Sequence, residues 1–137
     1  MSGMNYYVEH FGLAARQTTQ LRDWYETVLE AKCIFDNKET PPAYILKLPG
    51  GVLLEIYPAQ SEHPETSDNL LSGWRHVALQ VDSIEEAKRL LTGKGVTFED
   101  PIKPAGGGGR VLFFKDPEGN LLHLVERGPG SPFRGRR

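Results

Sequence analysis

Apolar positions follow a helical period in two segments of the chain and a strand period in most of the rest. The first helical segment, residues 18–31, carries its apolar residues on one face. The second begins after Ser83, where Glu86 has capping-box spacing, and ends at Gly93 or Gly95. The pattern predicts two amphipathic helices, with the apolar stripes Leu21, Trp24, Tyr25, Val28 and Leu29 in the first and Ile84, Ala87, Leu90 and Leu91 in the second.

Short apolar runs surround both helices and predict strands. A tight hairpin turn is predicted at residues 49–51 and a second turn at residues 116–120, because glycine and proline stand at the positions that turns require. The polar segment 58–72 is typical of a linker. The predicted strands are residues 6–14, 33–35, 43–48 and 52–57 before the linker, and residues 74–81, 96–98, 110–114 and 121–126 after it.

The predicted elements occur in the same order on both sides of the linker, namely βαβββ. His10 and His76 occupy equivalent places in the two first strands, and Glu55 and His123 occupy equivalent places in the two last strands. We therefore predict an α+β protein, a single domain over residues 1–127, built from two βαβββ modules. The modules cover about residues 5–58 and 73–127, and a disordered basic tail is predicted at residues 128–137.

Composition narrows the class of protein. The chain has 137 residues, of which 39% are hydrophobic and 25% charged, as in ordinary soluble domains. No apolar run approaches the roughly 20 residues that span a bilayer, and a net charge of −2 gives no general attraction to nucleic acid. The single cysteine, Cys33, and the absence of a signal-like segment predict a cytoplasmic protein with neither membrane nor nucleic-acid partners.

Four polar residues stand out because each lies in an otherwise mostly apolar strand. Each of His10, His76 and His123 taken alone is most simply a hydrogen-bonded strand residue. Together with Glu55 they form a plausible ligand set for one divalent ion, Zn²⁺, Ni²⁺, Fe²⁺ or Mn²⁺, if the two modules pack side by side. The fourth histidine, His63, lies in the linker and is predicted to be a solvated loop residue.

Several stretches of sequence resemble one family. They are HFGL at residues 10–13, LEI at 54–56, RHVALQVD at 75–82 and FKDPEGNLLHLVE at 114–126, together with Trp24-Tyr25 and Val28-Leu29. Over about residues 5–127 the chain resembles the vicinal oxygen chelate superfamily, also called the glyoxalase/bleomycin resistance/dioxygenase superfamily. The resemblance implies paired βαβββ modules that enclose a metal-binding cleft. It also implies that the metal ligands are His10, Glu55, His76 and His123.

Within this family the chain is similar to glyoxalase I, the lactoylglutathione lyases, with one departure. Those enzymes usually have glutamate where this chain has His123, and Glu126 is predicted to face the other side of the strand. The resemblance implies a metal-dependent lyase or isomerase whose small substrate is chelated through adjacent oxygens. Glu55 is then a ligand and the candidate base, His123 is the alternative base if it leaves the metal, and His10 and His76 are fixed ligands.

Two other functions remain open. An extradiol-type dioxygenase uses two histidines and one glutamate on Fe²⁺, although many such enzymes are about twice this length. A non-enzymatic binder of small molecules, similar to bleomycin-resistance proteins, needs no metal, and its members generally lack the four ligand residues. Modules in this family pair either within one chain or between two chains, and we expect a homodimer.

Other charged and aromatic residues receive weaker assignments. Lys47, Arg75 and Arg110 could meet an anionic substrate, but ordinary surface charge is the favoured interpretation. Four strand aromatics could line a cleft, but core positions are favoured for them; they are Tyr44, Tyr57, Trp74 and Phe113.

Overall fold

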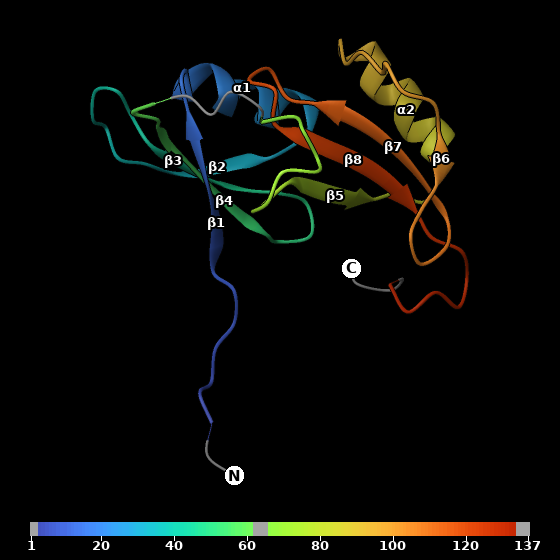
Figure 1. Cartoon of the computed structure of the whole chain (residues 1–137). Helices are drawn as coiled ribbons and strands as arrows, with labels where there is room; N and C mark the ends of the chain where they lie inside the picture. Colours follow the sequence, from blue (N-terminus) through green and yellow to red (C-terminus); the bar gives the residue numbers. More distant parts are fainter. Residues whose placement is uncertain (1–2, 62–65, 134–137) are drawn as a thin grey trace. The chain divides into compact units, whose positions relative to one another are not determined.

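The computed structural model describes residues 3–61 and 66–133 (Figure 1). The chain divides into two compact units, Met1–Glu62 and His63–Arg137. Among the described residues, no helix has both the length and the apolar character needed to cross a membrane. Part of the predicted linker and the last residues of the predicted tail, with His63 and Arg134, lie outside the described residues.

The first unit is a four-stranded sheet with one helix packed against it. The strands lie in the order β1-β4-β3-β2; β1 is parallel to β4, and the other neighbours are antiparallel. Leu21 and Tyr25 of α1 are buried, as are Leu46, Leu54 and Ile56 of the sheet, so the core lies between α1 and one sheet face. The elements are β1 His10–Ala15, α1 Thr18–Val28, β2 Lys32–Asp36, β3 Tyr44–Lys47 and β4 Leu53–Pro58.

The second unit repeats this arrangement, with strand order β5-β8-β7-β6. Its register is also equivalent, because Gly12 lies opposite Glu55 in the first unit and Ala78 lies opposite His123 in the second. This confirms the predicted α+β fold of two repeated modules and the predicted pairing of positions. The elements are β5 His76–Gln80, α2 Ile84–Gly93, β6 Lys103–Pro104, β7 Arg110–Lys115 and β8 Leu121–Glu126.

Both predicted helices are present, and α2 begins as its sequence indicates. The Ser83 side chain accepts a hydrogen bond from the backbone N–H of Glu86, as in a capping box. Helix α1 ends at Val28, earlier than predicted, because Glu30 adopts a left-handed conformation with φ of 60°. Ala31 is nevertheless buried, and its N–H bonds to the carbonyl of Tyr25. The chain directly after α1 therefore packs against the C-terminal end of the helix.

One predicted strand is wrong. Residues 96–98 form no strand; the Val96 N–H instead bonds to the carbonyl of Leu91, and the Phe98 ring contacts Phe114 edge-on. Val96 is thus buried, and Phe98 half-buried, by packing rather than by strand pairing. Strand β1 also starts at His10 rather than residue 6, because its partner β4 begins only at Leu53, opposite His10.

The two predicted turns are present. Gly50 and Gly51 both have positive φ, and the N–H of Gly51 bonds to the carbonyl of Leu48. In the second turn the buried Asp116 carboxylate accepts hydrogen bonds from the backbone N–H groups of Glu118 and Asn120. This turn fixes the start of β8, on which His123 lies.

The glycine loop before β7, residues 106–109, supplies a test of backbone geometry. Gly109→Ala is expected to lower the free energy of unfolding by about 3 kcal/mol, since a Cβ there would collide with the Glu126 carbonyl at a φ of +97°. Gly108 has a similar φ of +94° but no described atom near its added Cβ, so Gly108→Ala should cost only about 1–2 kcal/mol. Urea denaturation measures both; equal losses would contradict the collision.

A second test concerns the carboxylate that joins α2 to the sheet. Glu126 accepts hydrogen bonds from the Ile84 N–H and from Arg110, and these two partners hold its pKa below the ordinary value of 4.5. A lowered pKa in the folded state stabilises the fold above the ordinary pKa, and this stabilisation is lost as the pH falls through the lowered value. Glu126→Gln should therefore lower the free energy of unfolding most near pH 7. Its difference from wild type, measured by urea denaturation, should be smaller at pH 3.

The matched control for this pH series is Glu99→Gln. The Glu99 side chain is 77% exposed and lies 3.9 Å from Lys115. Glu99→Gln should therefore change the free energy of unfolding little across the pH series. A constant difference between wild type and Glu126→Gln from pH 7 to pH 3 would rule out the carboxylate as the source of the effect.

Candidate functional site

In the first unit, His10 and Glu55 lie together on the sheet face opposite α1. The Nε2 atom of His10 is 3.4 Å from the Oε1 atom of Glu55, and both side chains are about one-third exposed. The Nδ1 atom of His10 is 2.8 Å from the Oε1 atom of Glu9. This unit therefore presents one imidazole and one carboxylate that can approach the same ion.

In the second unit, His76 and His123 occupy the equivalent positions. Their ring centroids are 4.7 Å apart, and the Phe113 ring lies 4.8 Å from His123 and 6.0 Å from His76. His76 Nδ1 is 2.8 Å from the side-chain oxygen of Asn69, and His123 Nδ1 is 3.2 Å from the carbonyl of Leu124. Two imidazoles and one aromatic ring thus form a cluster on the sheet face away from α2.

His123 is the most buried of the three histidines. Burial lowers the pKa of its imidazole below the ordinary 6.5; the hydrogen bond to the Leu124 carbonyl opposes this effect, and the positive charges of His76 and Arg127 add to it. The ring is therefore neutral near pH 7, which is the form that binds a metal ion.

All three histidines share one arrangement of hydrogen bonds. In each ring Nδ1 faces an oxygen acceptor, supplied by Glu9, Asn69 or the Leu124 carbonyl. In His76 and His123 an oxygen acceptor at Nδ1 favours a proton there and leaves the lone pair on Nε2, as is usual for histidines that bind metals. His10 has a carboxylate oxygen near each ring nitrogen, Glu9 at Nδ1 and Glu55 at Nε2. The donor set of imidazole nitrogens and one carboxylate suits a first-row divalent ion.

The four predicted ligands are thus brought together as two pairs, one in each unit. Considering only residues 3–61 and 66–133, no three side chains of the types His, Cys, Asp or Glu gather as a metal site. Structural zinc sites use four protein ligands and catalytic sites about three, so one pair is not enough. That the two pairs bind a single ion stays a prediction.

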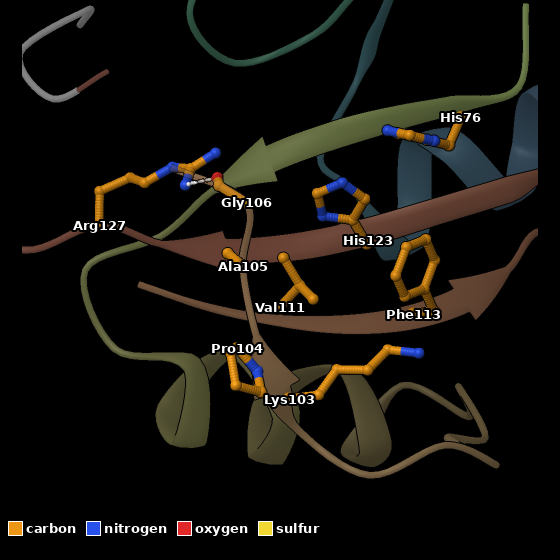
Figure 2. A pocket seen from close by; sticks show the side chains of 9 residues that line it. All are labelled: His76, Lys103, Pro104, Ala105, Gly106, Val111, Phe113, His123 and Arg127. Carbon is orange, nitrogen blue, oxygen red and sulfur yellow. Dashed lines mark hydrogen bonds between the residues drawn. The ribbon is translucent and has the colours of Figure 1, made fainter. Parts of the chain in front are cut away.

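A pocket of about 360 Å³ lies beside the histidine pair of the second unit (Figure 2). The side chains of His76, Val111, Phe113 and His123 line its floor, and residues 103–106 and Arg127 form its edge. Strand pairing places these residues on one sheet face, because Phe113 is paired with His123 and Val111 with Val125. Glu126, on the other face of β8, bonds to α2, so the floor of the pocket lies on the face away from α2. The pocket therefore opens directly onto two predicted ligands.

Several weaker assignments are now resolved. Phe113 lines the pocket rather than the core, whereas Tyr44 is buried against α1 and its hydroxyl lies 2.7 Å from Thr19 Oγ1. Trp74 is 90% exposed, so its predicted core position is wrong. Arg110 contacts Glu85 and Glu126 on the α2 side, as expected for ordinary surface charge.

The position of Glu126 agrees with the sequence prediction. Its carboxylate bonds to the first residue of α2, on the face opposite His123, so it does not replace the glutamate that glyoxalase I usually has at that position. Sequence reasoning missed three residues near the histidines, namely Asn69, Lys103 and Arg127. Only their strand-end or loop positions could have drawn attention to them.

Comparison with known proteins supplies a family. The model of the glyoxalase/bleomycin resistance protein/dioxygenase superfamily matches residues 7–124. No curated protein matches the chain in sequence.

Solved structures match the fold over nearly the whole chain. The fosfomycin resistance protein FosX from Listeria monocytogenes, as an E126Q mutant with Mn(II) and 1S,2S-dihydroxypropylphosphonic acid, is 18% identical with a TM-score of 0.70. The match covers 96% of this chain and 98% of FosX. A glyoxylase/bleomycin resistance protein/dioxygenase domain from Frankia sp. EAN1pec is 21% identical, with a TM-score of 0.72 and coverage of 93% and 96%. At these identities the likeness shows the fold.

Proposed function

The chain belongs to the glyoxalase/bleomycin resistance protein/dioxygenase superfamily, and from this membership we propose that it is a metal-dependent enzyme acting on a small molecule. The observation that carries the proposal is the shared hydrogen bonding of His10, His76 and His123. Each ring has Nδ1 against an oxygen, which leaves Nε2 of His76 and His123 for a metal, while Nε2 of His10 faces Glu55, the fourth proposed ligand. His10 and His76 lie at equivalent strand positions, and His123 lies at the position equivalent to Glu55. Core or surface histidines with no common role have no reason to share an oxygen at Nδ1 at these positions.

In this proposal His10, Glu55, His76 and His123 hold one divalent ion of the first transition row, zinc, nickel, iron or manganese. When bound, the ion supplies Lewis-acid polarisation of substrate oxygens. FosX was solved with Mn(II), which supports a divalent ion for this fold. Glu55 carries the only carboxylate of the set and acts as the proton acceptor, while His10 and His76 serve as fixed ligands. His123 is the alternative proton acceptor.

The reaction we propose is that of a glyoxalase-like lyase or isomerase, in which adjacent substrate oxygens meet the ion. Glu55 lies at the open face of its sheet with its carboxylate about one-third exposed, so it can reach a proton on a bound substrate. The pocket beside His123 has room for a small molecule and includes an aromatic wall, Phe113.

We also propose that the enzyme is a homodimer. Each unit contributes two of the four proposed ligands. If the units pair between two chains rather than within one, the complete ligand set requires a dimer. Sedimentation equilibrium measures the assembly directly. A cytoplasmic location stays a prediction from the sequence.

Elemental analysis of the purified protein, followed by two assays, tests the proposed function. We expect one divalent ion per pair of units and isomerisation of the methylglyoxal–glutathione hemithioacetal. Oxygen uptake with a catechol and bound iron would instead identify a dioxygenase. A protein that binds no divalent ion under any loading condition, yet binds small aromatic molecules, would refute the enzyme and support a non-enzymatic binder.

A further inference from the structure

The pocket of the second unit has an unusual charge balance. Among the described residues that line it, none is acidic, whereas Lys103 and Arg127 are cationic and His76 and His123 are imidazoles. Charged pockets attract ligands of the opposite sign because little water screens the field within them. The lining therefore favours a ligand that carries negative charge.

Lys103 is the cation best placed to meet such a ligand. It lies on β6, paired with Val111 of the pocket floor, and its Nζ atom lies 5.2 Å from the centre of the Phe113 ring. No carboxylate of the described residues forms an ion pair with it. Figure 2 shows its side chain running along the pocket edge toward Phe113, whose ring in turn contacts both histidines. The ammonium group is thus held near His76 and His123 by a weak contact with the Phe113 ring. An ion pair with an anionic ligand can replace this contact.

Arg127 supplies fixed positive charge on the opposite edge of the pocket. Its Nη1 atom donates hydrogen bonds to the carbonyl oxygens of Gly106 and Gly108, and its guanidinium stacks 4.3 Å from the Phe133 ring centre. These contacts tie the group to the glycine loop (Figure 2).

We propose that this pocket binds the anionic group of the substrate, a carboxylate or a phosphonate, and that Lys103 is the residue that pairs with it. Arg127 adds positive charge from the loop, and Phe113 with Val111 contacts the apolar body of the ligand. The inference rests on the proposed function only in identifying this ligand as the substrate. It makes Lys103 a specificity-determining residue that selects anions over neutral molecules of the same shape.

The test compares three probes of similar shape, benzoate, phenylphosphonate and neutral benzamide, by NMR titration of the full-length protein. Each titration is run on metal-free and on zinc-loaded protein, so that anion binding by a metal is separated from binding by Lys103. We expect the two anions to bind at least about tenfold more tightly than benzamide in both forms. The affinity should fall as salt is raised. The preferred anion distinguishes a carboxylate from a phosphonate substrate.

Variants assign the effect to one residue. Lys103→Gln should weaken anion binding by about tenfold, and Lys103→Arg should restore most of it. Lys88→Gln, the same change on the exposed side of α2, should have no effect. Benzoate and phenylphosphonate affinities that are equal in Lys103→Gln and wild type would overturn the proposal, as would benzamide binding as tightly as the anions or no binding of either anion.

These outcomes are separable from those of the proposed function. Anion binding that depends on Lys103 in a protein that takes up no divalent ion would refute the enzyme and keep the anion site. Stoichiometric metal binding with no preference for anions would support the proposed enzyme and refute the anion site.

Discussion

His123→Ala is expected to lower the affinity for a divalent ion by more than about 100-fold. Changes to residues that only support a ligand typically cost 10–100-fold, and this substitution removes a ligand itself. His123 is a demanding test because it is the buried member of its pair and is held neutral near pH 7 by burial. The measurement is titration of metal-free protein with zinc against a competing chelator, together with elemental analysis of the metal-loaded protein.

Two variants show whether the lost affinity reflects a lost ligand. His123→Glu places a carboxylate where glyoxalase I usually has one, so it should keep most of the affinity that the alanine variant loses. His63→Ala is the same chemical change outside the proposed ligand set and should have no effect. Because His123 is buried, thermal melting of each metal-free variant shows whether the fold is retained.

His10→Ala extends the same test to the other unit. If one ion is held by both pairs, removing His10 should weaken binding about as strongly as removing His123, although the two residues belong to different units. Stoichiometric metal that is undiminished in both variants would eliminate the proposed site.

Most of the fold follows from local patterns in the sequence. Alternation of side chains along a strand predicts that Glu126 faces away from His123, and the hydrogen bond of Glu126 to α2 confirms it. The capping box at Ser83 and the Asp116 turn were also predictable, because each depends on residues a few positions apart. The strand predicted at residues 96–98 failed because apolar periodicity does not distinguish strand pairing from packing against a helix end.

The candidate site was predictable only as far as its strands were. The equivalence of His10 with His76, and of Glu55 with His123, follows from element order and is visible in the strand register. The acceptors at Nδ1 of each histidine could not be predicted, since Asn69 reaches His76 from a loop and the Leu124 contact is a backbone one. Lys103 was missed because it lies on a two-residue strand that no sequence pattern marks.

The final expectation concerns Glu55, the only carboxylate of the proposed ligand set. Glu55→Gln keeps the size of the side chain but removes its charge and its capacity to accept a proton. We expect a weaker metal affinity and a loss of at least about 100-fold in kcat that saturating metal does not restore, since a positioned proton acceptor typically contributes 10²–10⁴-fold. The rate is measured in whichever of the hemithioacetal and catechol assays gives turnover.

The fold should be unaffected by this change. The Glu55 side chain is 36% exposed, and the contact recorded for it is the one at 3.4 Å with His10, so the free energy of unfolding of the metal-free protein should stay near that of wild type. Glu39→Gln, an exposed carboxylate of the same unit, should alter neither metal binding nor rate. Metal affinity that falls while kcat recovers fully at saturating metal would leave Glu55 a ligand only, and the proton acceptor would then be His123, the other candidate in the set.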